Sequence, residues 1–304
     1  MADTSFTTYY TGYRAFRQQL FDLFTAEGAV LETKDIPSSL GTTWGYWLSE
    51  WDGRHPEMQR SAASIGEDEI KLFYDLCQLI QPARSYIIGN SFGLSTFCLA
   101  LAWPAGFVVA IDTWGDADTL NMAKPLFERI MAHHDMANVR VHTGASPQDT
   151  PAALTLFPTT AKPLSLYFID GLHRNPAALH DFEGALPFLD SSSVVLWHNV
   201  NAVSESFRMA YEQGGRALFD QHHVLRTHGP LGIDYSSTAH PLLHAYLHDA
   251  TLIWNNWEYY MALLEREDMR RWQGDASLAT LPRRVAAAAY RRLTHARPGD
   301  GAPQ

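Results

Sequence analysis

The sequence has little of what marks secreted, disulfide-bonded or membrane proteins. It holds only two cysteines, Cys77 and Cys98, both in apolar surroundings. They form neither a disulfide framework nor a CxxC metal pattern, so a reducing, cytoplasmic setting is the default. No apolar run approaches the roughly 20 residues that a membrane-spanning helix needs, and the first residues lack a signal-peptide pattern. These absences predict a cytoplasmic protein with no membrane partner.

Positive charge is also scarce. The chain has 23 Lys and Arg against 33 Asp and Glu, for a formal net charge of -10. An acidic protein is poorly suited to hold a nucleic-acid backbone, so no nucleic-acid partner is expected. Arginine pairs occur at 270–271, 283–284 and 291–292. They are interpreted as solvated helix positions, because the rest of the chain is acidic.

The 304 residues are 46% hydrophobic and suffice for a large core. From about residue 64, short apolar runs alternate with helical patterns. The five strand-then-helix pairs begin at Ser85, Phe107, Val139, Leu164 and Ser192. Two further strands are expected around Gly229. Continuous apolar strands indicate a parallel sheet covered on both faces. The sequence therefore predicts an α/β fold with a doubly wound, mostly parallel, seven-stranded Rossmann-like sheet.

Three regions are expected: an aromatic-rich N-terminal cap over 1–62, a catalytic domain over 63–255, and C-terminal helices with a tail over 256–304. In the cap, a helix should end at Gly28. The stretch "LGTTWGYWLSEWDGRHP", at 40–56, favours irregular structure or a short helix rather than a strand. Its tryptophans Trp44, Trp47 and Trp51 either pack the cap or close as a lid over a ligand.

The first strand of the sheet is followed by the glycine turn "GNSFG", Gly89 to Gly93. Glycine permits a tight turn and close approach of a ligand. The amides of the turn and of the next helix suit a negatively charged group. Asp112 ends the next strand about 20 residues later, where a carboxylate can accept hydrogen bonds from two ribose hydroxyls. The alternative for Asp112 is a helix cap or a surface turn.

Two later strands end in chemically capable residues. Asp170 ends one, with His173 three residues on, and His198-Asn199 ends the next. Imidazoles titrate near neutral pH, so His173 and His198 are candidate general bases. Asp170 could instead cap the following helix, although Asn175, which precedes a proline, is the better cap.

The glycine turn, "VVAID", "HTGAS" and "LYFIDGLHRNPAALHDFEGALPFLDSSSVVLWHNV" resemble class I S-adenosylmethionine-dependent methyltransferases, over about 64–215. Within that class the text is similar to sugar and natural-product O-methyltransferases. The resemblance implies S-adenosylmethionine as the cofactor, Asp112 at its ribose and Asp170 near its reacting methyl. It departs from the family at Ile87, usually acidic, and at Asn199, usually aspartate. The implied cofactor-binding positions are Gly89, Asn90, Ser91, Gly93, Asp112, Thr113, Ala145, Ser146 and Asp170, with Ala145 and Ser146 at the adenine.

Some members of that group use a divalent metal, which would here be held by Asp170, His198 and Asn199. This set suits an ion softer than magnesium. The alternative is a polar, metal-free edge, with Asp170, His173 and His198 as the catalytic residues.

The resemblance implies O-methylation of a small molecule in natural-product or secondary metabolism. Methyl transfer to nitrogen or carbon and a non-catalytic partner subunit remain alternatives. An NAD-dependent oxidoreductase would be expected to have a GxGxxG turn, which is absent. The histidines His240, His244 and His248 lie four residues apart on one helix face, where they form either a zinc-binding site or a surface or interface stripe. Aromatic C-terminal helices allow a homodimer.

Overall fold

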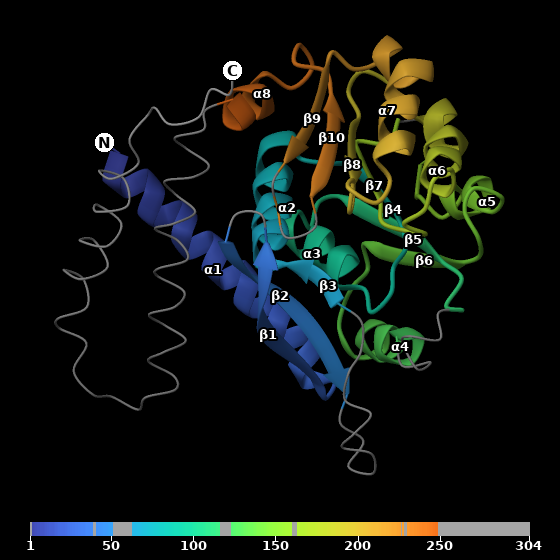
Figure 1. Cartoon of the computed structure of the whole chain (residues 1–304). Helices are drawn as coiled ribbons and strands as arrows, with labels where there is room; N and C mark the ends of the chain where they lie inside the picture. Colours follow the sequence, from blue (N-terminus) through green and yellow to red (C-terminus); the bar gives the residue numbers. More distant parts are fainter. Residues whose placement is uncertain are drawn as a thin grey trace. The chain divides into compact units, whose positions relative to one another are not determined.

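The computed structural model describes residues 2–38, 41–50, 63–115, 123–159, 163–225, 227 and 230–248 (Figure 1). By its internal contacts the chain divides into two units, Met1–Leu243 and His244–Gln304. The predicted helices and the arginine pairs beyond residue 248 lie outside the described residues. The helices of the described part are α1 (Ala2–Ala26), α2 (Glu67–Ile80), α3 (Leu94–Ala102), α4 (Ala123–His133), α5 (Thr150–Leu154), α6 (Ala177–Ala185), α7 (Ser204–Gln213) and α8 (Pro241–His248).

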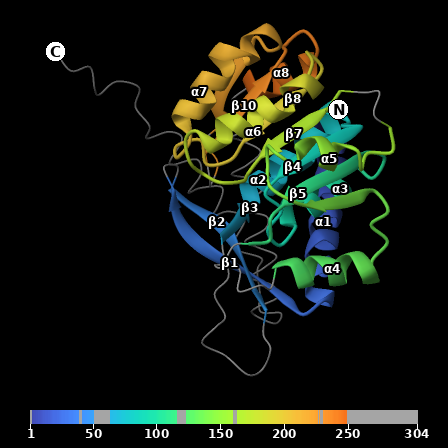
Figure 2. The ribbon, with the colours of Figure 1, turned by 90° about the vertical axis from the view of Figure 1, so that its right-hand side faces the viewer.

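The centre of the first unit is a seven-stranded sheet in the order β6-β5-β4-β7-β8-β10-β9 (Figure 2). Five strands are parallel, and β10 runs antiparallel to both of its neighbours. The predicted mostly parallel seven-stranded sheet is confirmed, including all five strand-then-helix pairs. Its strands are β4 (Arg84–Ile88), β5 (Phe107–Asp112), β6 (Val139–Thr143), β7 (Leu166–Ile169), β8 (Val194–Trp197), β9 (Gln221–Leu225) and β10 (Leu231–Tyr235).

Helices cover both faces of the sheet, which explains why β4, β7 and β8 are buried throughout. On one face, Tyr86 and Trp197 belong to a core that includes residues of α5, α6 and α7. On the other face, Phe73 of α2 meets Phe168 of β7 edge to face, with ring centroids 5.0 Å apart. Two-sided burial is the condition under which strands read as unbroken apolar runs.

The helix α1 ends just before Gly28, as predicted, and Gly28 adopts a positive φ of 80°. It is tied to α2 through the fully buried carboxylate of Glu67. Tyr13 donates a hydrogen bond to Glu67 at 2.7 Å, and Arg17 pairs with the same carboxylate at 2.9 Å. These bonds satisfy a charge that would otherwise be costly to bury.

The expectation of irregular structure at 40–56 is wrong for most of that stretch. Residues Gly41–Glu50 form strand β2, which pairs antiparallel with β1 (Ala29–Ser38) and with β3 (Ala63–Gly66). Threonine and aromatic residues favour strands, and this preference outweighs the two glycines that suggested a loop. The side chains of Trp44 and Trp47 and the whole of Trp51 lie outside the described residues, so the lid hypothesis stays a prediction.

Two composition-based expectations can be compared with the structure. Cys77 and Cys98 are free and buried, and burial raises the pKa of both thiols. Among the described residues, no helix is both long and apolar enough to cross a bilayer.

Candidate active site

The carboxyl ends of β4, β5, β7 and β8 meet at one edge of the sheet. Gly89 N–H donates to the carbonyl of Ile111 at 3.0 Å, which joins the end of β4 to the end of β5. Asp170 N–H donates to Ile88 O at 2.9 Å, and His198 N–H donates to Ile169 O at 3.0 Å. The ladder therefore brings the glycine turn, Asp112, Asp170 and His198 to the same edge, as the sequence predicted.

Glycine is needed at Gly89 for two reasons. Its φ is +83°, and a Cβ there would lie 2.1 Å from the carbonyl oxygen of Asp170. Real side-chain contacts are never that close, so only glycine lets the end of β4 pass the end of β7. Gly93, with φ +87°, begins α3, and a Cβ there would meet Phe127 at 2.7 Å. The turn is therefore packed against the strand that carries Asp170.

The carboxylate of Asp112 binds the glycine turn itself. Its Oδ2 accepts from the amides of Asn90 at 2.7 Å and Ser91 at 2.8 Å. Its Oδ1 accepts from the amide of Trp114 at 2.7 Å. The turn amides of Asn90 and Ser91 thus bind the Asp112 carboxylate. The alternative role of Asp112 as a helix cap is not observed. Since a carboxylate has about four acceptor sites, roughly one remains, on Oδ1, for a ligand hydroxyl.

The loop after β6 lies beside this carboxylate. Gly144 N–H donates to the backbone carbonyl of Asp112 at 3.0 Å. Ala145 N–H donates to Asp149 at 2.9 Å, and Ser146 shares a hydrogen bond with Thr150. Thr113 is exposed. The predicted adenine-side residues Ala145 and Ser146 therefore follow directly after a backbone hydrogen bond to Asp112, and their role at an adenine stays a prediction.

At the other end of the edge, Asp170 lies between two imidazoles. His198 Nδ1 is 2.5 Å from Asp170 Oδ1, and His173 Nε2 is 3.0 Å from the same oxygen. His198 is buried, with 9% of its surface exposed, whereas His173 is exposed. The interpretation of Asp170 as a helix cap is wrong, because its side chain points to these histidines.

A second carboxylate, Glu69, faces the buried imidazole. Glu69 is fully buried on α2, and its Oε1 lies 3.3 Å from His198 Nε2 without a hydrogen bond of good geometry. Its other oxygen accepts from Gly66 N–H at 2.7 Å. The sequence analysis did not predict Glu69 as a site residue. The Gly66-x-x-Glu69 spacing of a helix-capping glutamate was the available signal for Glu69.

The charges of this cluster follow from its packing. Burial alone would lower the pKa of His198, but the carboxylates of Asp170 and Glu69 raise that pKa well above its usual range. Burial alone would raise the pKa of Asp170, but charged His198 and the hydrogen bond from His173 lower it. This direction of shift favours the protonated form of His198. The catalytic roles of His198 and His173 stay predictions.

The predicted metal ligands lie together with one further candidate, His173. Among the described residues, Asp170, His173 and His198 place ligand atoms within 4.8 Å of one another. The side-chain amide of Asn199, whose φ is positive at 50°, lies 3.4 Å from His173 Nδ1 and 3.2 Å from His198 Nδ1. One carboxylate with imidazoles fits a softer divalent ion rather than magnesium. The role of Asn199 as a ligand stays a prediction.

Asn175 has a different role from the one predicted. Helix α6 begins at Ala177 without a side-chain cap. Asn175 Oδ1 instead accepts from the amide of Ser206 at 2.8 Å and from its hydroxyl at 2.6 Å. Asn175 therefore holds the first turn of α7 to the loop that carries His173.

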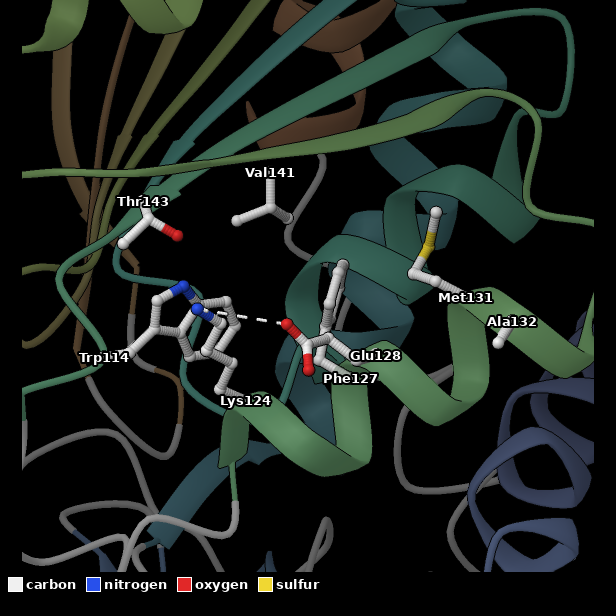
Figure 3. Close-up of a pocket in the computed structure, with 8 residues that line it drawn as sticks. All are labelled: Trp114, Lys124, Phe127, Glu128, Met131, Ala132, Val141 and Thr143. Atoms are coloured by element: carbon white, nitrogen blue, oxygen red, sulfur yellow. Dashed lines mark ion pairs between the residues drawn. The ribbon is translucent and has the colours of Figure 1, made fainter.

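A pocket of about 380 Å³ adjoins the glycine turn on the α4 side (Figure 3). Trp114, whose amide binds Asp112, faces the ion pair of Lys124 and Glu128 across this pocket. The Trp114 and Phe127 rings lie 5.8 Å apart. The pocket offers an apolar and aromatic surface next to the ribose-side carboxylate. Its lining is Trp114, Lys124, Phe127, Glu128, Met131, Ala132, Val141 and Thr143.

A family model described as a methyltransferase domain matches residues 87–200. The match includes the glycine turn, Asp112, Asp170 and His198. This match agrees with the resemblance to methyltransferases stated from the sequence, and the seven-stranded sheet with one antiparallel strand is the fold that the resemblance implied.

One curated relative is the uncharacterized protein y4gI of Sinorhizobium fredii. It is 30% identical over 137 residues, which cover 43% of this chain and 15% of that protein. The chain thus spans a small part of the length of this relative. The methyltransferase domain is also similar to an O-methyltransferase from Bacillus cereus in complex with SAH, at 20% identity and a TM-score of 0.45, covering 57% of this chain and 83% of that one.

Two other solved structures are similar to a like degree. One is a putative caffeoyl-CoA O-methyltransferase from Staphylococcus aureus, at 17% identity and a TM-score of 0.44, covering 55% and 82% of the two chains. The other is TomG from Streptomyces achromogenes, an O-methyltransferase involved in tomaymycin synthesis, at 20% identity and 0.44, covering 57% and 81%.

Proposed function

We propose that this chain transfers the methyl group of S-adenosylmethionine to a hydroxyl of a small molecule. The observation that carries the proposal is the meeting of the glycine turn, Asp112 and Asp170 at one edge of a methyltransferase domain. Methyl transfer to nitrogen or carbon would use the same edge. A natural-product acceptor, a cytoplasmic location and a homodimer stay predictions from the sequence.

The cofactor is proposed to lie along the glycine turn. Its ribose would use the remaining acceptor site of Asp112 Oδ1, and its adenine would lie between the loop at Ala145 and Ser146 and the Trp114 pocket. Ile87, where the family usually has an acidic residue, is fully buried inside β4. The methionine amine would therefore rely on acceptors at the strand ends, such as the backbone carbonyls near Gly89 and the carboxylate of Asp170.

The proton of the acceptor hydroxyl is assigned to His173. Asn199 Nδ2 approaches His173 Nδ1, and His173 Nε2 faces Asp170, so the neighbours set the tautomer with its proton on Nε2. Nδ1 then carries the lone pair, and an acceptor hydroxyl would displace the Asn199 amide from it to pass on its proton, while Asp170 stabilises the imidazolium that forms. His198 pairs with Asp170 and is itself paired with Glu69, and these contacts fix the position of the Asp170 carboxylate. The domain's remaining task is to align the acceptor with the methyl group and exclude water.

A divalent metal is the alternative way to lower the pKa of the acceptor hydroxyl. It would be held by Asp170, His173 and His198, and would supply Lewis acidity toward the acceptor oxygen. The ion pair of Asp170 with His198, whose protonated form the neighbouring carboxylates favour, supports the metal-free arrangement.

Calorimetry with S-adenosylmethionine, S-adenosylhomocysteine and NAD tests this function. Tight binding of S-adenosylhomocysteine, with no heat from NAD, is the expected result. Binding of NAD alone would support an oxidoreductase and overturn the proposal. No binding of any of the three would point to a non-catalytic partner subunit.

A further inference from the structure

A second pocket lies at the opposite edge of the same sheet. Arg84 and Phe107 are the first residues of β4 and β5, and the pocket between their ends has a volume of about 410 Å³. Because β4 has five residues, this edge is roughly 13 Å from the glycine turn along the strand. The pocket is lined by Ala83, Arg84, Pro104, Ala105, Gly106, Phe107, Ala137, Asn138, Pro158 and Thr159.

Arg84 is the only charged residue among the described residues that line this pocket. It is 5% exposed, and its Nε–H is buried without a hydrogen-bond acceptor. The described part of the chain offers its guanidinium no carboxylate within ion-pair distance. A buried charge without a counter-charge is costly, and burial lowers the pKa of Arg84. The fold therefore keeps a cation here that has no carboxylate partner in the described part of the chain.

The packing of Arg84 leaves its donors available. Its guanidinium carbon lies 4.3 Å from the ring centroid of Phe157, in a cation–π contact. A guanidinium that packs on a ring through its face still has its N–H groups directed outward in its own plane. Among the Arg84 nitrogens, only Nε is fully buried without a partner. The two terminal nitrogens keep some exposed surface and make no hydrogen bond in the described part of the chain. This is the geometry that binds a carboxylate or phosphate through two parallel hydrogen bonds.

The rest of the lining indicates what else the ligand carries. Pro104, Phe107 and Pro158 give the pocket apolar walls, and Thr159 adds a hydroxyl. The Asn138 amide is occupied, since its Nδ2 donates to the carbonyls of Ala100 and Gly106. A ligand that fits this lining combines an anionic head with a flat apolar body.

We propose that this pocket is a second ligand site, in which Arg84 binds a small organic anion with a flat apolar body. The site is separate from the methyl-transfer edge and does not depend on the function proposed there.

The test measures binding of benzoate and phenyl phosphate to the full chain by calorimetry and by the rise in melting temperature. Benzamide, which is neutral, and inorganic phosphate, which has no apolar body, are the control ligands. Both organic anions should bind and stabilise, and both controls should bind at least severalfold more weakly. Absence of binding by the organic anions at concentrations on the order of 10 mM would overturn the proposal. Equal binding of benzamide would also overturn it.

Arg84→Met removes the charge and should weaken anion binding roughly tenfold or more, the loss expected for one charge-assisted hydrogen bond. Its melting temperature without ligand should stay the same or rise, since an uncompensated charge is removed. Arg84→Lys, which keeps the charge but not the planar fork, should also bind more weakly. Arg208→Met, which removes an exposed arginine paired with Glu212, is the matched control and should bind like the unmodified chain. Unchanged anion affinity in both Arg84 variants would contradict the proposal.

Discussion

At the scale of single residues, the active edge is defined by the hydrogen-bond and ion-pair partners of its two carboxylates. Asp112 uses three backbone amides, and Asp170 uses two imidazoles. His198 lies between Asp170 and Glu69, and these carboxylates raise its pKa, which favours its protonated form. The predicted residues Asp170, His173 and His198 lie together, and their catalytic roles stay predictions.

His173→Ala should lower kcat by roughly 10²–10⁴-fold, the range expected for loss of a general base, once an acceptor is in hand. Affinity for S-adenosylhomocysteine should stay nearly unchanged, because His173 is assigned to the acceptor and not to the cofactor. Steady-state kinetics and calorimetry measure the two effects. His180→Ala, at an exposed position of α6, is the control. An unaffected kcat in His173→Ala would remove the residue from the mechanism.

The cation at His198 predicts a pH dependence of stability. A histidine whose pKa is raised on folding contributes its full stability below its unfolded pKa of about 6.5, and loses that contribution as pH rises through the folded pKa. Asp170, whose pKa is lowered, contributes above about 3.9 and loses its contribution as pH falls through its folded value. The stability gap between the unmodified chain and His198→Gln should therefore be largest between about pH 4 and 6.5.

Urea unfolding from pH 4 to pH 10, with EDTA present, measures that gap. The gap should shrink on the alkaline side as His198 loses its proton. His180→Gln controls for the general effect of removing a histidine. A gap that does not vary with pH would mean that folding leaves the pKa of His198 unchanged, and a gap that shrinks as pH falls below about 6.5 would mean that His198 is neutral in the folded protein.

At the scale of elements, two strand ends pass each other closely at Gly89. The Cβ of any other residue would meet the Asp170 carbonyl at 2.1 Å, in a conformation that already disfavours side chains. Gly28 offers a comparison, because its φ of +80° is similar and nothing lies within 4 Å of its added Cβ. Substitution of Gly28 therefore tests backbone strain alone, whereas substitution of Gly89 tests backbone strain together with a steric clash.

Gly28→Ala should cost about 1–2 kcal/mol of unfolding free energy, from the left-handed backbone alone. Gly89→Ala should cost more, about 3 kcal/mol or above, because β4 and β7 must also move apart. Denaturant unfolding of both variants measures this difference. Equal costs would mean that the close approach at Gly89 relaxes freely.

At the scale of the whole molecule, the metal question decides which chemistry the edge uses. The ion pair between Asp170 and protonated His198 favours a metal-free reaction. Methyl transfer should therefore persist after dialysis against EDTA, to within about twofold, since the base His173 stays in place. Activity that disappears with EDTA and returns with Zn²⁺, Co²⁺ or Mn²⁺ would assign Asp170, His173 and His198 to a metal.

The sheet was predictable from the sequence because two-sided burial leaves unbroken apolar runs between helical segments, as in β7. Strand β2 was not, because Gly41 and Gly45 mask the strand preference of their neighbours. The candidate edge was predictable because parallel strands present their carboxyl ends together. The cationic His198 was not, since it depends on Glu69, which lies 129 positions earlier (198 − 69) and reaches the site only after folding. The place of His173 in the ligand cluster likewise depends on the turn after β7, which brings its ring to Asp170.

The central claim is that the glycine turn and Asp112 form the site of one adenosyl cofactor. Calorimetric titration of the unmodified chain, Asp112→Ala and Asp190→Ala with S-adenosylhomocysteine tests it most directly. Asp190 is an exposed aspartate that also accepts a backbone amide, that of Ser192, and so controls for loss of a carboxylate. The account predicts one site per chain, at least about tenfold weaker binding in Asp112→Ala, and no change in Asp190→Ala. Equal affinity in all three proteins, or none in the unmodified chain, would contradict it.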